Sequence, residues 1–247
     1  PGAGPVKSVA DCQTVPRWSP DGTKLLFMQA GKLFVCNSDG SGLRDLSVGI
    51  SPLVIHGGYS WSPDSRRVAY CTLNNYNIWT GRCWVVNIDG SNRKQICPSN
   101  SLFPSWSPDG TKIAFLGYGN PNGICTVDPD GNNLDYLLDL RGVGWLSYVY
   151  QSGHFGWSPD SRKLSFFLYL PGDGWLMRVV DCSSKALTSL PQSMTNGENM
   201  GIWAPDGSDE LLILGTGYNP ELVHSDGSGR RKLFKDPTPV YSFDWVQ

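Results

Sequence analysis

The sequence has few charged residues and almost no net charge. Of its 247 residues, 17% are charged, and the formal net charge at pH 7 is −2. A protein that binds the phosphates of nucleic acid needs a basic face, so we expect no nucleic-acid partner. The sequence also lacks an apolar run of 18 residues, which a membrane-spanning helix would need. We therefore expect no membrane span.

Residues that usually carry catalysis or bind metals are also scarce. The three histidines, His56, His154 and His224, are scattered along the chain. There is no C-x-x-C pair, which is typical of zinc and redox sites, and no G-x-S-x-G sequence, which holds the nucleophile of many hydrolases. We therefore expect no catalytic residue, no bound metal, no cofactor and no enzyme activity.

The sequence does contain a repeated motif, W-[SA]-P-D-[GS]. Its copies are spaced by 43, 45, 51 and 46 residues, and a degenerate sixth copy follows 42 residues later at Trp245. A period of about 40–50 residues with several short strands in each unit is typical of a β-propeller. The five full copies begin at Trp18, Trp61, Trp106, Trp157 and Trp203.

Each repeat predicts four antiparallel strands. The Trp ends the first strand, and Pro and Asp then form a turn in which the last residue takes a strained conformation. Two apolar runs follow, joined by a Gly- or Asn-containing loop, and in four repeats an Asp-Gly pair precedes the last strand. Asp-Gly predicts a two-residue hairpin turn with positive φ values. No segment has helical periodicity, so we predict an all-β chain that forms one propeller domain over residues 1–247.

This repeat resembles the TolB-type six-bladed propellers, which also occur beside the hydrolase domain of prolyl-oligopeptidase-like peptidases. The resemblance covers nearly the whole chain, from about residue 5 to residue 247. It implies a propeller but no single activity, and TolB-like proteins are envelope proteins that bind other proteins. Polysaccharide lyases on related propellers use a His-rich metal centre, which the scattered histidines do not match. The resemblance, together with a composition low in charge, implies a periplasmic or extracellular location.

The two chain ends predict a partial sixth blade. Residues 5–11 resemble a last strand and residues 240–247 a first strand, whereas the two middle strands are missing. Either five full blades carry appended ends, or six positions are present and the sixth blade is incomplete; Trp245 favours six. The incomplete blade is explained by a cut or processed chain, by a tolerated gap, or by strands from another chain. In the last case residues 1–11 and 240–247 would join copies into an oligomer or filament.

The chain has seven cysteines, an odd number, so at least one is unpaired within the chain. Four of them fall in predicted strands, where Cys often serves as a small buried residue. Cys71 and Cys83 flank the loop 72–82 and are expected to face each other across a hairpin. We predict a disulfide between them as one alternative, provided that the strand register permits its strict geometry.

Five predicted loops on one face of the propeller are rich in aromatic residues, with Asn and Gly around them: residues 73–81, 117–123, 141–154, 170–174 and 215–219. Aromatic side chains give large contact areas at low entropic cost, so we predict a non-enzymatic module that recognises a protein through this face. Two alternatives stay open: a structural subunit that assembles by strand complementation, and a propeller that binds carbohydrate by stacking on sugar rings. The candidate binding residues are Tyr76, Trp79, Tyr118, Trp145, Tyr148, Tyr150, His154 and Tyr218.

Overall fold

The computed structural model describes the backbone of residues 16–50, 53–74, 77–119, 122–141, 155–170, 174–190, 201–214 and 220–234. It describes their side chains except at 53–57, 78–79, 169–170, 174–175 and 214. Throughout these ranges the regular structure consists of β-strands, which confirms the predicted all-β class.

The strands form five four-stranded antiparallel sheets, each from one repeat. The first sheet contains β1 (Arg17–Trp18), β2 (Lys24–Gln29), β3 (Lys32–Asn37) and β4 (Arg44–Asp45). The second contains β5 (Leu53–Trp61), β6 (Arg67–Asn74), β7 (Asn77–Asn87) and β8 (Lys94–Gln95). The third contains β9 (Ser101–Trp106), β10 (Ile113–Gly117), β11 (Gly123–Val127) and β12 (Asp135–Asp139).

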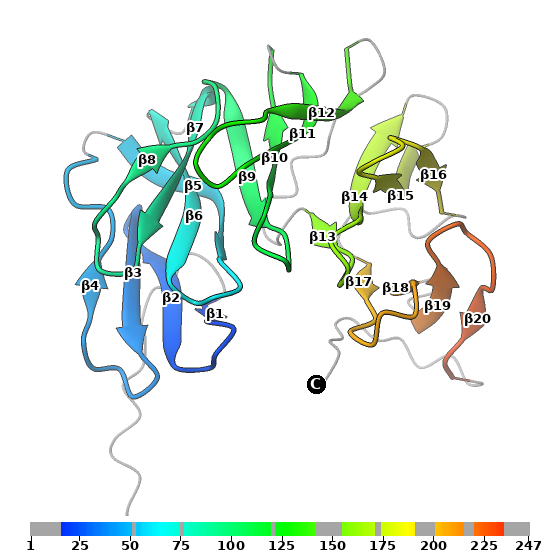
Figure 1. Cartoon of the computed structure of the whole chain (residues 1–247), viewed down its shortest axis with the longest axis horizontal. Helices are drawn as coiled ribbons and strands as arrows, with labels where there is room; N and C mark the ends of the chain where they lie inside the picture. Colours follow the sequence, from blue (N-terminus) through cyan, green and yellow to red (C-terminus); the bar gives the residue numbers. More distant parts are fainter. Residues whose placement is uncertain are drawn as a thin grey trace, which may run out of the picture.

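The fourth sheet contains β13 (Gly156–Trp157), β14 (Lys163–Leu170), β15 (Gly174–Asp181) and β16 (Leu187–Ser189). The fifth contains β17 (Ile202–Trp203), β18 (Glu210–Leu214), β19 (Pro220–His224) and β20 (Arg231–Lys232). The sheets follow one another around an arc, with the first and fifth sheets at its two ends (Figure 1). The expected sixth blade falls on residues 1–15 and 235–247, which lie outside the described residues.

The apolar core is divided among the interfaces between neighbouring sheets. Four clusters of buried side chains join the first sheet to the second, the second to the third, the third to the fourth and the fourth to the fifth. Alternate residues of a strand point to opposite faces of its sheet. In β2, for example, Leu26 and Met28 belong to the cluster shared with the second sheet, whereas Leu25 and Phe27 do not.

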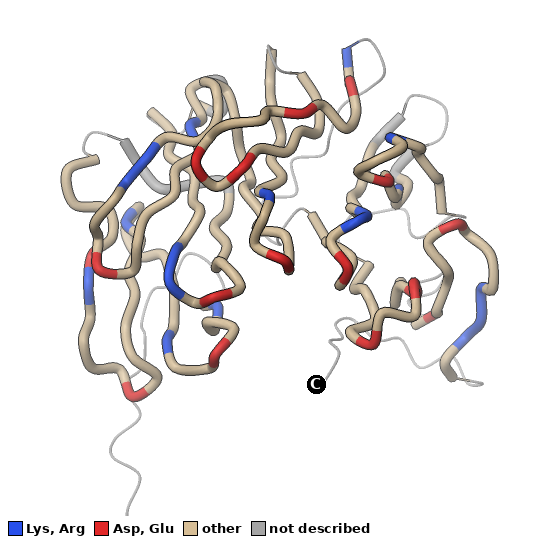
Figure 2. The backbone as a smooth tube through the Cα atoms, in the orientation of Figure 1, with Lys and Arg blue, Asp and Glu red and all other residues tan. Residues whose placement is uncertain are grey.

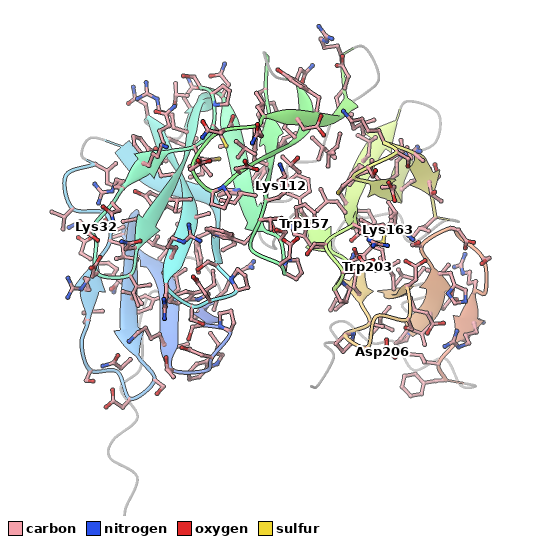
Figure 3. All side chains as sticks on the ribbon, in the orientation of Figure 1. Lys32, Lys112, Trp157, Lys163, Trp203 and Asp206 are labelled. Carbon is pink, nitrogen blue, oxygen red and sulfur yellow. The ribbon has the colours of Figure 1, made fainter. Side chains whose placement is uncertain are left out.

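The repeated Trp attaches each sheet to the one before it. Its indole Nε1 donates a hydrogen bond to a backbone carbonyl oxygen in three interfaces, over 2.9–3.1 Å. In all three, the acceptor is the residue directly before the Trp of the preceding sheet. The pairs are Trp61 with Arg17, Trp157 with Ser105, and Trp203 with Gly156. Trp157 and Trp203 are labelled in Figure 3.

The turn after the Trp is held by its own Ser and Asp side chains. In the first turn, Ser19 Oγ donates to Asp21 Oδ1 at 2.6 Å and accepts from the backbone N–H of Lys24 at 2.9 Å. The second, third and fourth turns repeat both bonds. In the fifth turn Ala204 replaces the Ser, and Asp206 accepts from the backbone N–H of Ser208. These bonds confirm that the PD pairs form turns.

The predicted type of the Asp-Gly hairpin was wrong. Asn37 N–H donates to the carbonyl of Ser41, and Gly40 N–H donates to the carbonyl of Asn37, so the loop has three residues. Gly40 has a φ of +79°, whereas Asp39 is not among the positive-φ residues. This is a type I turn followed by a left-handed Gly, which forms a bulge, and the two-residue turn would need positive φ at both positions.

Candidate functional site

Because its strands are antiparallel, each sheet has two rims, and different turns and loops lie at each. The turn that follows the Trp and the loop between third and fourth strands lie at one rim, because both join strands at the same end. The loop between second and third strands lies at the opposite rim, where the chain also passes to the next sheet. We call the first the turn rim and the second the loop rim. Figure 2 shows acidic residues recurring in the turns.

Most predicted binding residues belong to the loop rim but lie outside the described residues. These are Tyr76, Trp145, Tyr148, Tyr150, His154 and Tyr218. Trp79 lies within β7, and its side chain is not among those described. Tyr118 follows β10, and its half-buried ring packs against the two clusters on either side of the third sheet. Its part in binding stays a prediction.

An open pocket of about 540 Å³ lies at the loop rim of the third sheet. Two of its lining residues, Gly119 and Asn122, come from the predicted loop 117–123. The others were not predicted as binding residues: Tyr136 and Asp139 belong to β12, and Arg141 follows it at the start of the predicted loop 141–154. Tyr136 is 42% exposed, so its ring is accessible to a ligand.

Arg141 and Asp139 form an ion pair in this pocket. Arg141 Nε donates to both oxygens of the Asp139 carboxylate, over 2.9–3.0 Å, and its Nη2 also donates to Oδ2. The backbone N–H of Arg141 donates to Oδ1 at 2.9 Å. Hydrogen bonds from Arg141 lower the pKa of Asp139 to about 2. The pocket thus presents a fixed carboxylate, a guanidinium and an exposed aromatic ring side by side.

Cys71 and Cys83 are directly opposite each other in the β6–β7 pairing, as the hairpin predicted. The structure does not join them, and both side chains are fully buried between the second and third sheets. Burial raises the pKa of each thiol well above its ordinary value, which makes both poor nucleophiles. The disulfide between them stays a prediction.

In the described ranges, no group of three or more His, Cys, Asp or Glu side chains is arranged to hold a metal ion. In the same ranges, no helix has the length and apolar character needed to cross a membrane.

No family model matches the chain, but two curated proteins are similar to parts of it. An uncharacterised protein, Atu1656 of Agrobacterium fabrum, is 29% identical over 142 residues, which make up 51% of this chain and 46% of that protein. The oligogalacturonate lyase of Dickeya dadantii is 34% identical over 73 residues, 27% of this chain and 19% of that protein. The matches thus cover less than half of each curated relative.

Solved structures match most of the chain. An oligogalacturonate lyase in complex with manganese has a TM-score of 0.66 at 15% identity, covering 88% of this chain and 63% of that one. A putative TolB from Agrobacterium tumefaciens has a TM-score of 0.65 at 20% identity, covering 90% and 80%. A puromycin-hydrolysing peptidase of Mycobacterium tuberculosis has 0.68 at 16%, covering 92% and 37%. The similar proteins therefore include enzymes as well as TolB, and what they share with this chain is the β-propeller fold that its repeats predicted.

Proposed function

We propose that this chain is a non-enzymatic binding module that recognises a protein partner through its loop rim. The observation that carries the proposal is the open pocket beside the loop 117–123, where Tyr136, Asp139 and Arg141 meet. Tyr and Arg are the side chains that most often dominate binding energy at protein interfaces, because they combine a large flat surface with a polar end. The pocket provides one of each in adjacent positions.

The geometry of the pocket favours recognition with little reorganisation. The Asp139 carboxylate fixes the Arg141 guanidinium by several hydrogen bonds, so less side-chain entropy is lost when a partner binds. Both residues remain substantially exposed, and the guanidinium can accept a partner's carboxylate or carbonyl in addition to its own. The predicted aromatic loops would enlarge this surface around the pocket.

The test is a comparison of three full-length proteins used as bait in an extract of the source cells. The first is the natural chain, the second carries Tyr136→Ala and Arg141→Ala, and the third carries Leu187→Ala. Leu187 is an exposed residue of β16, the equivalent strand of the next sheet, so it is a matched control. We expect at least one protein to bind the first and third baits and to be reduced about tenfold or more on the second. Equal recovery on all three would contradict the proposal.

A second candidate function is the binding of an acidic oligosaccharide in the same pocket. It is supported by the similarity to the Dickeya lyase, 34% identical over 73 residues, and by an aromatic ring beside a guanidinium, which suits a sugar ring that carries a carboxylate. Calorimetric titration with trigalacturonate distinguishes the two candidates. Saturable binding that Arg141→Ala abolishes favours the sugar, and analysis of the products would show whether the chain also cleaves it.

For location we propose the periplasm or the exterior of the cell. The support is the low charge of the chain together with its TolB-type fold. Fractionation of the source cells, followed by immunoblotting, tests this: recovery of the protein with cytoplasmic markers would contradict it.

A further inference from the structure

Four of the seven cysteines lie together in the interface between the second and third sheets. They are Cys71, Cys83, Cys97 and Cys125, and their side chains are 0–4% exposed. The thiol of Cys83 is in hydrogen-bonding contact with the thiols of both Cys71 and Cys97. Cys83 therefore has two thiols within reach, of which the hairpin predicts only Cys71.

The strand register places Cys71 and Cys83 near the short limit for a disulfide. The carbonyl oxygen of Cys83 accepts a hydrogen bond from the N–H of Ile96 at 3.0 Å, so the backbone polar groups of Cys83 point towards β8 and away from β6. Cys71 and Cys83 are thus a non-hydrogen-bonded pair, in which opposite Cα atoms are about 4.5 Å apart. Most disulfides span about 5.5–6 Å between Cα atoms and few are shorter than about 4.4 Å, so a bond between these two would be strained and easily reduced.

Cys97 is a less constrained partner for Cys83. It lies two residues after the end of β8 at Gln95, where the chain leaves the sheet. Its side chain is nevertheless held in the same buried cluster as that of Cys83. Because no ladder position fixes the distance between Cys83 and Cys97, this pair can adopt the relaxed geometry of a disulfide.

Cys71 has a hydrogen bond that a disulfide would remove. Its Sγ donates to the carbonyl oxygen of Ser101, 3.3 Å away in β9 of the third sheet. A bond between Cys83 and Cys97 leaves this contact intact. A bond between Cys83 and Cys71 would break it and would leave Cys97 as the buried thiol.

We propose that Cys83 and Cys97 form a disulfide and that Cys71 remains a thiol. The bond forms as the chain folds, before the third sheet covers the thiols, and the oxidant is a small organic disulfide. The Cys83 thiolate attacks one sulfur of the oxidant and releases one thiol; the Cys97 thiolate then attacks Cys83 Sγ and releases the second thiol. The leaving thiolates take up the two protons that the cysteines lose. Where Cys71 and Cys83 pair first, the same attack by Cys97 on Cys83 Sγ expels Cys71.

The bond attaches the outermost strand of the second sheet to its neighbour. That strand, β8, has two residues, Lys94 and Gln95, and it lies in the loop that the bond between Cys83 and Cys97 closes. A disulfide of this kind persists in an oxidising compartment, which agrees with the proposed location. The inference goes beyond the proposed binding function and does not depend on it.

The test is a disulfide map of the refolded full chain. The reduced, unfolded protein is refolded in a mixture of oxidised and reduced glutathione, remaining thiols are alkylated in denaturant, and the peptides are identified without reduction. Trypsin cleaves after Arg82 and Lys94, so Cys71, Cys83 and Cys97 fall on three separate peptides. We expect the peptide pair that joins Cys83 to Cys97 to be at least fivefold more abundant than the pair that joins Cys83 to Cys71.

Two results of this map would overturn the proposal. One is a predominance of the bond between Cys71 and Cys83, and the other is complete alkylation of Cys83. Cys125 is the control, because it is buried in the same cluster and should be alkylated.

Two matched variants test the strain. Cys71→Ala and Cys97→Ala each leave Cys83 with one of its two partners. We expect the disulfide of Cys97→Ala to be reduced at a glutathione concentration at least tenfold lower than that of Cys71→Ala, and equal sensitivity would contradict the argument from register. Should a variant fail to fold, the map of the natural chain still decides which pair forms.

Discussion

The hydroxyl oxygen of Ser161 accepts a hydrogen bond from the backbone N–H of Asp109, 3.0 Å away, and so joins the turn of the fourth sheet to that of the third. Ser65 makes the same bond with Asp21 at 3.1 Å, between the second and first sheets. Both Ser residues have left-handed backbones, with φ of +61° and +59°, at positions where other repeats have Gly. The hydrogen bond to the neighbouring sheet offsets the strain.

Substitution of Ser161 separates the strain from the hydrogen bond. Ser161→Ala removes the bond but keeps the strained backbone, so we expect a loss of about 1 kcal/mol in the free energy of unfolding. Ser161→Gly removes the bond and also relieves strain of about 1 kcal/mol, so it should be closer to neutral. Urea unfolding of both variants checks this. If the Gly variant is the less stable of the two, the explanation is wrong.

Trp157 and Trp106 offer a matched pair for measuring the indole hydrogen bond. Both are buried, but Trp157 Nε1 donates to the carbonyl oxygen of Ser105, whereas Trp106 Nε1 is a buried donor with no acceptor among the described residues. We expect Trp157→Phe to cost about 1 kcal/mol more than Trp106→Phe, measured by urea unfolding. In Trp106→Phe the contact with the guanidinium of Arg67 weakens, but an unsatisfied donor is removed. Equal losses would show that the bond to Ser105 adds nothing.

Acid should destabilise the protein through the turn carboxylates. Hydrogen bonds from Ser19 and Thr23 lower the pKa of Asp21 to about 2, and the ordinary value is about 3.9. Because the folded-state pKa is the lower one, the stabilisation is present above about pH 4 and is lost as the pH falls towards 2. Ser19→Ala should raise the pKa of Asp21, measured by NMR titration, and leave that of Asp139 unchanged. An unaltered Asp21 titration would contradict this assignment.

Gly123, beside the candidate pocket, should not tolerate a side chain. Its φ is +149°, and a Cβ there would lie 1.9 Å from the carbonyl oxygen of Leu138. We expect Gly123→Ala to cost about 3 kcal/mol or more, since both backbone strain and overpacking contribute. Gly90→Ala is the control, because Gly90 also has a positive φ but has no atom within 4 Å of the added Cβ. It should cost about 1 kcal/mol. Similar midpoints for the two in urea would argue against the close approach.

The fold was predictable because its determinants are local. Trp, Pro and Asp stand next to one another in the chain, and the turn they form marks the end of the first strand in all five sheets. The alternation of Gly and Ser at the end of this turn was not predictable. The partners of Ser65 and Ser161 are 44 and 52 residues away, so only the packing of two sheets reveals them. A two-residue hairpin turn was predicted where the loop has three residues, because Asp-Gly occurs in hairpin loops of more than one length.

The candidate site was predicted only in part. The sequence indicated the loop 117–123 from its Gly and Asn content, and that loop does line the pocket. It did not single out Tyr136 and Asp139, because they follow the pattern of an ordinary last strand. Arg141 begins the predicted loop 141–154, but only the aromatic residues and the His of that loop were taken as candidates. A signal was present in the sequence: Asp139 and Arg141 lie within the 51-residue interval between Trp106 and Trp157, the longest between repeats. Tyr118 packs between sheets because aromatic rings near strand ends serve the core as readily as a binding surface.

The division of the core into four separate clusters has a consequence for how substitutions combine. Each cluster involves two neighbouring sheets, so a cavity made in one leaves the packing of the other three intact. The total stability of the arc is then close to a sum of nearest-neighbour terms. Changes such as Leu26→Ala, in the first cluster, and Ile213→Ala, in the last, should therefore lower it additively. Sequence variation can accumulate in one interface without compensation elsewhere, which helps to explain how so regular an architecture persists among proteins of such low identity.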